Sequence, residues 1–103
     1  MAYRLRYTPD ADLDLRHLGR PLEALVRRAT PRFLADTPAA RSTKRKAMEP
    51  NPLGADWELR LDDLRVYYDI DEAAQTVRVL RVGRKRRERV VIRGLETDLR
   101  EQP

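Results

Sequence analysis

The chain of 103 residues contains no cysteine and only one histidine, His17. The lack of cysteine excludes disulfide bonds and thiolate metal sites, and it fits a reducing compartment such as the cytoplasm. Catalytic schemes that depend on a cysteine or histidine nucleophile are also excluded. We interpret His17 as an ordinary surface or helix-packing residue, and we expect neither a metal nor a cofactor.

Long apolar runs and glycine-rich signatures are missing as well. No apolar run approaches the length of a membrane span, and the N-terminal sequence MAYRLRYTPD is charged where a signal peptide needs an apolar stretch. No glycine pattern matches a P-loop or a dinucleotide-binding fingerprint. We therefore expect one soluble, cytoplasmic domain over residues 1–95, followed by a short acidic tail over residues 96–103.

Basic residues are abundant, and they are unevenly distributed. The net charge is +5, yet residues 81–94 alone carry seven basic residues and one acidic residue. Residues 57–80, in contrast, carry six acidic and three basic residues. An excess focused in this way predicts a binding site for a polyanion. The alternative is that the run RKRRER is a solvated turn that only keeps a small protein soluble.

The first half of the chain has the pattern of one strand and two helices. Residues 3–8 (YRLRYT) alternate apolar and polar side chains, as in a half-buried strand. Thr8 is a suitable N-cap for a helix that begins at the following proline. An apolar stripe predicts a second helix over residues 21–33. Pro31 lies inside this stripe and predicts a kink or a break there.

The second half has the pattern of a loop and three strands. Prolines and polar residues predict a loop over residues 37–56, and strands are expected over residues 57–61, 64–70 and 76–83. The link Asp62–Asp63 is short enough for a tight hairpin, and the last strand is apolar on both faces, as in the centre of a sheet. The prediction is an α+β fold in which two helices pack on one face of a three-stranded antiparallel meander and leave the other face open.

The strand alternation gathers polar side chains on this open face. Glu58, Arg60, Arg65 and Tyr67 all point away from the helices, and the tight hairpin makes them neighbours. Because the last strand is expected to end at Gly83, the basic turn would extend over the same face. Arginine binds phosphate through paired hydrogen bonds, and an aromatic ring can stack on an unpaired base. A carboxylate beside such cations has the parts needed for metal-free RNA cleavage by a 2′-hydroxyl.

A simpler interpretation exists for the same residues. Arg60 and Arg65 can form a surface network with Glu58 and Asp69, which is of small energetic worth. Tyr67 can be an exposed strand tyrosine that β propensity alone favours. The convergence of these residues on one face beside the basic turn favours a phosphate or nucleic-acid site.

The segments WELRL, DDLRVYYDID and VRVLRVGRKRRERV resemble the RelE/ParE superfamily of type II toxin–antitoxin toxins. The resemblance extends from Tyr3 to about Leu95. RelE-like members are small basic ribonucleases that cut mRNA in the ribosomal A site, whereas ParE-like members share the fold and poison DNA gyrase; a small antitoxin neutralises both. The resemblance therefore implies a ribosome-dependent mRNA endoribonuclease with mRNA, the ribosome and a cognate antitoxin as partners. The alternatives are a gyrase inhibitor without nuclease activity and a noncatalytic member that binds RNA or its partner.

The resemblance also carries roles onto individual positions. The strand arginine of the family falls on Arg65, the second basic strand position falls on Arg60, and the basic residue after the last strand falls on Arg84, Lys85 or Arg86. These positions imply a site that holds the scissile phosphate.

Two positions depart from the RelE pattern. This chain has Glu58 where RelE has a basic residue, and Val91 where RelE has a tyrosine. Glu58 is therefore the candidate general base, and the acid is Lys85, Tyr67 or a turn arginine. The expected catalytic residues are Glu58, Arg60, Arg65 and Lys85, and the expected RNA-binding residues are Lys44, Arg45, Lys46, Tyr67, Arg81, Arg84, Arg86, Arg87 and Arg89.

Overall fold

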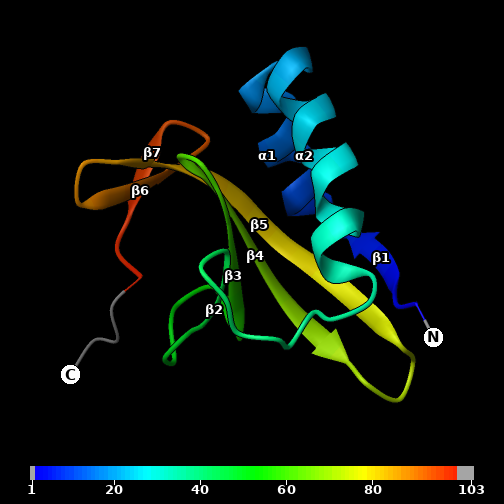
Figure 1. Cartoon of the computed structure of the whole chain (residues 1–103). Helices are drawn as coiled ribbons and strands as arrows, with labels where there is room; N and C mark the ends of the chain where they lie inside the picture. The colour runs from blue at the N-terminus through cyan, green and yellow to red at the C-terminus, as the bar shows by residue number, and fades with distance from the viewer. Residues whose placement is uncertain (1, 100–103) are drawn as a thin grey trace.

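The computed structural model describes residues 2–99, which form a curved sheet with two helices on one side (Figure 1). The fold is α+β, as predicted. The elements are β1 (Arg4–Tyr7), α1 (Pro9–Leu18), α2 (Arg20–Leu34), β2 (Arg45–Ala47), β3 (Trp57–Leu61), β4 (Leu64–Asp71), β5 (Thr76–Arg86), β6 (Arg89–Ile92) and β7 (Leu95–Thr97).

The first helix begins where the sequence predicts. The hydroxyl of Thr8 accepts a hydrogen bond from the Ala11 amide at 3.1 Å, which satisfies one of the free donors of the first turn. The sequence predicts a kink or a break at Pro31, and the break is wrong because the second helix continues through Pro31 to Leu34. Pro31 lies in the last turn, where the missing N–H costs a single bond, and the burial of Leu34 in the core offsets that cost.

The sheet contains more strands than the predicted meander. The order is β2-β3-β4-β5-β6-β7, and β1 runs parallel to β5. β2, β6 and β7 were not expected, and β5 continues to Arg86 instead of ending at Gly83. A bulge opposite Tyr67 and Tyr68 places one extra residue, Leu80, in β5. The predicted pairing of β3, β4 and β5 is confirmed, including the hairpin at Asp62–Asp63.

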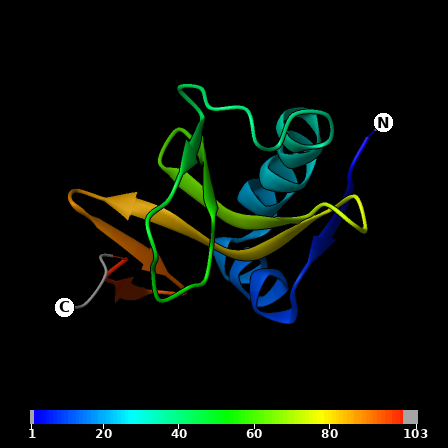
Figure 2. The same cartoon turned by 90° about the horizontal axis from the view of Figure 1, so that it is seen from below.

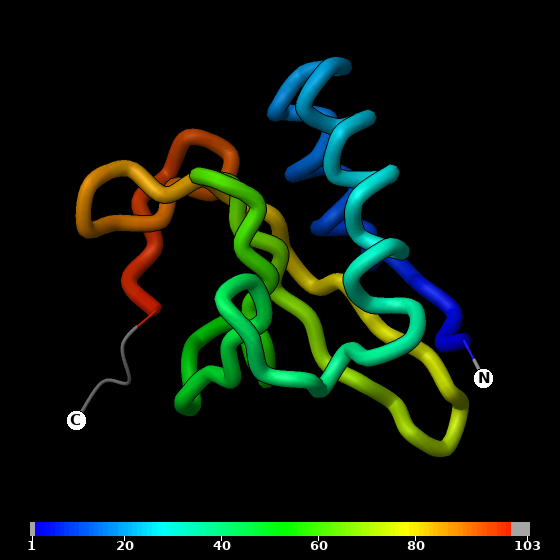
Figure 3. The backbone as a smooth tube through the Cα atoms, in the orientation of Figure 1, coloured from blue at the N-terminus to red at the C-terminus, as the bar shows by residue number. Residues whose placement is uncertain are grey.

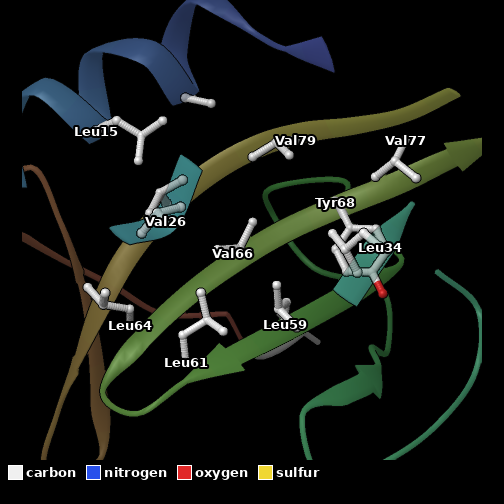
Figure 4. Close-up of a cluster of buried hydrophobic side chains, with 12 residues drawn as sticks. Leu15, Val26, Leu34, Leu59, Leu61, Leu64, Val66, Tyr68, Val77 and Val79 are labelled. Atoms are coloured by element: carbon white, nitrogen blue, oxygen red, sulfur yellow. The ribbon is translucent and has the colours of Figure 1, made fainter. Parts of the chain in front are cut away.

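The main core lies between the helices and the sheet. Leu15 and Val26 from the helices pack toward Leu59, Val66 and Val79 of the strands (Figure 4). All five side chains are fully buried. Apolar residues of β1 and of the two helices complete this layer, so the predicted burial of this sheet face is confirmed.

The opposite face of the sheet is not open, contrary to the prediction. The segment around residues 48–56 and the β6–β7 hairpin lie on this side (Figures 2 and 3). They form a second cluster with the buried residues Ala55, Tyr67 and Ile92. β6 approaches so closely that a Cβ at Gly83 would lie 2.7 Å from Ile92 Cγ1. Contacts between segments distant in sequence close this face, and strand alternation carries no information about them.

The C-terminal part of the chain only partly falls within the described residues. β7 takes up residues 95–97 across the expected start of the acidic tail, and residues 100–103 of that tail lie outside the described part of the chain. Neither helix within residues 2–99 is long and apolar enough to cross a membrane.

Candidate nucleic-acid interface

A cavity with four charged side chains in its lining lies at the edge of the sheet where β2 pairs with β3. Lys46 and Glu58 are directly opposite each other across the two strands. Arg60 Nε lies 2.7 Å from Glu58 Oε1, and the Glu58 side chain is only 12% exposed. The cavity has a volume of about 460 Å³ and is lined by Lys46, Ala47, Met48, Glu49, Glu58, Arg60 and Leu99. A partly desolvated carboxylate in contact with a guanidinium thus lines the same accessible hollow as a lysine.

Tyr67 is the clearest correction to the predicted site. It is opposite Glu58 in the β3–β4 pairing, as expected, but its side chain is fully buried in the second cluster. Burial raises the pKa of the Tyr67 hydroxyl, and the negative charge of Glu58 raises it further. The hydroxyl has no partner at hydrogen-bonding geometry within residues 2–99. The Tyr67 side chain is therefore not accessible for stacking on a nucleobase or for donating a proton to the leaving oxygen of RNA.

Arg65 is also less accessible than the alternation predicts. It pairs with Arg60 across the hairpin, but only 8% of the residue is exposed. Its Nη1 donates to the carbonyl oxygens of Asp62, at 2.6 Å, and Leu64, at 2.9 Å. Asp62 has a positive φ of 55°, so the guanidinium stabilises a strained turn. Arg65 thus has a structural role in the turn, and its role in phosphate binding remains a prediction.

Several of the expected RNA-binding residues are engaged within the protein. Arg45 donates to the carbonyl oxygens of Phe33 and Ala40, close to the C-terminal end of α2. Lys44 lies over the Phe33 ring, with its Nζ 5.6 Å from the ring centroid. Arg84 pairs with Asp63 at 2.9 Å. These contacts leave the three residues fewer donors for an external anion.

Arg81 belongs to a buried ion-pair cluster that the sequence did not reveal. Its Nε lies 2.7 Å from Asp14, and this pairing raises the pKa of the guanidinium. Asp14 is almost fully buried, and it also accepts a hydrogen bond from the Val82 amide at 3.0 Å and forms an ion pair with Arg93 at 2.8 Å. Arg93 in turn reaches Asp10. The cluster connects α1 to β5 and to the β6–β7 turn.

The basic run is a hairpin and not a loose turn. β5 ends at Arg86, Arg87 adopts a positive φ of 58° in the turn, and β6 begins at Arg89. Lys85, Arg86, Arg87 and Arg89 are exposed and make no ion pair with residues 2–99. The run is also divided between two sheet faces. Arg84 is opposite Leu64, a residue of the main core, whereas Lys85 points the other way.

Arg84 and Arg86 of the basic run line a second cavity, which was not expected from the sequence. It has a volume of about 200 Å³ and lies between the end of α1, the end of β5 and the β6–β7 turn. Its lining residues are His17, Leu18, Arg84, Arg86, Val91, Arg93 and Gly94. No local pattern predicts this site, because it joins residues about seventy positions apart. Within residues 2–99, no three histidine, aspartate or glutamate side chains are grouped so that they could hold a metal ion.

Residues 5–89 match the model of the ParE toxin of type II toxin–antitoxin systems, parDE. The chain belongs to this family. The predicted membership of the RelE/ParE superfamily is thereby confirmed, and this ParE-family chain is a type II toxin. It is also similar to a chain in the crystal structure of the toxin–antitoxin complex RelBE2 from Mycobacterium tuberculosis. The two share 27% identity with a TM-score of 0.67, over 82% of this chain and 100% of that one. A search of curated proteins found no match to the sequence of this chain.

Proposed function

We propose that this toxin is an endoribonuclease whose active groups line the cavity between β2 and β3. The observation that carries the proposal is the grouping of Lys46, Glu58 and Arg60 around one hollow of about 460 Å³. Cleavage of RNA by its own 2′-hydroxyl needs a base, a cation beside the phosphate and an acid for the leaving oxygen. The three side chains supply these groups without a metal.

The chemistry follows from their positions. A Glu58 oxygen accepts the proton of the 2′-hydroxyl, and the 2′-oxygen forms a bond to the adjacent phosphorus. Arg60, held by Glu58 at 2.7 Å, stabilises the additional negative charge on the phosphate oxygens. The bond from phosphorus to the 5′-oxygen breaks, and a proton from Lys46 passes to that oxygen. The products are a 2′,3′-cyclic phosphate and a free 5′-hydroxyl. Lys85 is the second candidate for the acid, whereas the buried Tyr67 is no longer one.

The exposed hairpin supports nucleic acid as the target. Lys85, Arg86, Arg87 and Arg89 present four cations without an internal partner among residues 2–99, beside a surface hollow that also contains Glu88 and Glu96. Cations arranged in this way bind a phosphate backbone and release counterions. We propose mRNA on the ribosome as the substrate, because RelE-like toxins cut mRNA in the ribosomal A site.

We also propose that an antitoxin protein neutralises this toxin. The similar structure from M. tuberculosis is a toxin–antitoxin complex, and the net charge of +5 would attract an acidic partner segment. Expression of the toxin alone should arrest growth, and co-expression of a short acidic protein encoded beside it should restore growth. Unimpaired growth of cells that contain the folded toxin alone would contradict this proposal.

The replacement Glu58→Gln tests the base. It keeps the shape of the side chain and removes its basicity, so RNA cleavage on ribosomes should fall by about 10²–10⁴-fold. Glu49→Gln is the matched control, because Glu49 lines the same cavity without contacting Arg60. The control should retain cleavage within about threefold of the parent. Equal activity of the two variants would remove Glu58 from the mechanism.

A ParE-like inhibitor of DNA gyrase is the second candidate. Residues 5–89 match the ParE toxin model, and the burial of Arg65 and Tyr67 leaves fewer reactive groups in contact with solvent than a nuclease of the RelE pattern would present. Assays of mRNA cleavage on ribosomes and of gyrase supercoiling, run side by side on the same preparation, separate the two. Inhibition of supercoiling without cleavage would replace the nuclease proposal.

A further inference from the structure

The second cavity is built from arginines that the protein already holds in place. Arg84 uses Nε and Nη2 to bind Asp63, and Arg93 uses Nε for Asp14 and Nη2 for Asp10. The Nη1 group of each guanidinium therefore has no partner among residues 2–99. A guanidinium fixed on one side by a carboxylate loses little freedom when its other side binds a ligand.

Two further side chains of the cavity, those of Arg86 and His17, have no hydrogen bond or ion pair among residues 2–99 that would occupy them. Arg86 is exposed and forms no ion pair with residues 2–99, so all its donors are available. His17 is exposed at the end of α1, and its Nε2 lies close to Gly94 of the β6–β7 turn. The cavity of about 200 Å³ is thus lined by one histidine and three arginines, and the described lining contains no carboxylate. Such a set of donors is complementary to a tetrahedral oxyanion.

The position of this cavity suggests the source of the anion. Arg86 lines both this cavity and the hollow over the basic hairpin. A nucleic-acid strand that follows the hairpin would therefore bring one of its phosphates to His17. The cavity shares no lining residue with the one that contains Glu58, so it is a separate site.

We propose that His17, Arg84, Arg86 and Arg93 form a second site, which binds one phosphate group of a nucleic-acid backbone away from the cleavage site. The source of this phosphate rests on the proposed RNA target, whereas the site itself depends only on the geometry of the cavity. The contact would fix the path of the strand along the hairpin without taking part in the chemistry.

The single histidine makes the test direct. The Cε1 proton of His17 gives one isolated NMR signal, which can be followed while inorganic phosphate is added at constant ionic strength. We expect a saturable shift of this signal. A short single-stranded oligonucleotide with 2′-deoxy sugars, which resists cleavage, should produce the same shift at a lower concentration because the hairpin contributes further contacts.

Two variants make the test specific. Arg86→Gln should weaken phosphate binding by about tenfold or more, since it removes the unpaired guanidinium. Arg28→Gln removes the same charge from an exposed position of α2 that lines neither cavity, and it should leave the affinity for inorganic phosphate within about twofold. Both positions are exposed, so both variants should keep the melting temperature of the parent.

Several results would overturn the proposal. The absence of a saturable shift, or an equal loss of phosphate affinity in the two variants, would remove the site. A shift with inorganic phosphate but not with the oligonucleotide would show that free phosphate is the ligand. An equally strong shift with a glutamate peptide of the same charge would assign the cavity to an acidic protein segment. If RNA is not cleaved but the oligonucleotide still shifts His17, the site stands and the nuclease proposal falls.

Discussion

Tyr67 and Tyr68 are consecutive residues of β4, and both are fully buried, but they belong to opposite faces of the sheet. Tyr68 stacks on Trp57 in the main core, and its hydroxyl donates to the carbonyl oxygen of Pro38. Tyr67 lies in the second cluster, and its hydroxyl has no partner within residues 2–99. On the helix-covered face, the buried tyrosine hydroxyl has a hydrogen-bond partner. On the other face, segments distant in sequence bury Tyr67 next to Glu58, and its hydroxyl has no hydrogen-bond partner among residues 2–99.

Truncation of one side chain on each face should give the largest effect. Leu59→Ala removes a fully buried side chain from the main core and should lower the free energy of unfolding by about 2–5 kcal/mol. Ile92→Ala, in the second cluster, should cost about 2 kcal/mol because fewer buried neighbours surround it. Urea unfolding measures both. A larger loss for Ile92 would make the second cluster the principal core.

The closure of the second face depends on the absence of a side chain at Gly83. Gly83→Ala would place a Cβ 2.7 Å from Ile92 Cγ1 and 2.8 Å from the Val91 carbonyl oxygen. We expect a loss of about 1–3 kcal/mol as β6 moves away. Lys85→Ala, at an exposed position of the same strand, is the control and should have almost no effect. Equal stability of the two variants would show that β6 adapts without cost.

Alkaline pH should weaken both faces. The pKa values of Tyr67 and Tyr68 are raised chiefly by burial, so the folded protein keeps these protons while the unfolded chain releases them above its ordinary value of 10.0. Stability is fully present below that pH, and it should fall by about 1.4 kcal/mol per pH unit for each tyrosine as the pH rises further. Urea unfolding at a series of pH values checks this slope. An unchanged stability would mean that the buried hydroxyls ionise freely.

The hydroxyl of Tyr68 should be worth about 1 kcal/mol. Tyr68→Phe removes the donor and leaves the Pro38 carbonyl oxygen without it, which should lower the free energy of unfolding by that amount. Thermal or urea unfolding at neutral pH measures the loss. No loss would indicate that water replaces the tyrosine at Pro38.

The same change at Tyr67 should act in the opposite direction. Tyr67→Phe deletes a buried hydroxyl that has no hydrogen-bond partner within residues 2–99, and it should stabilise the protein by up to about 1 kcal/mol. The alkaline slope should also become shallower in this variant. A destabilisation at neutral pH would reveal a hydrogen bond to the hydroxyl, and Glu58 is the first partner to examine.

Local patterns predicted much of this fold, and contacts between distant segments account for most of what they missed. The N-cap at Thr8, the strands β3 and β4 and the two-residue hairpin between them are local signals, and each is confirmed. The exposure that the alternation in β4 predicted for Arg65 and Tyr67 is wrong, because both residues are buried. β6 was missed because its short apolar run becomes a strand only where it packs against Gly83. The pairing of Lys46 with Glu58 depends on β2. This strand was missed because it lies within residues 37–56, whose prolines and polar residues predict a loop. The sequence placed Glu58 beside Arg60 correctly, but it could not show which of the surrounding arginines were already engaged.

The buried carboxylate of Asp14 also bears on the order in which the parts of the fold form during synthesis. Asp14 lies 67 residues before Arg81 and 68 before Val82, and its neighbour Asp10 lies 83 residues before Arg93. While the ribosome makes the chain, α1 emerges long before these partners, and burial of an unpaired charge is unfavourable. We therefore expect α1 to reach its final position only after Arg81 and Val82 are available to pair with Asp14, and Arg93 then adds the contact to Asp10. A nascent toxin that lacks β5 and the turn after it has neither the basic surface of Lys85, Arg86 and Arg87 nor the partners of Asp14, so folding and the capacity to act should be acquired together.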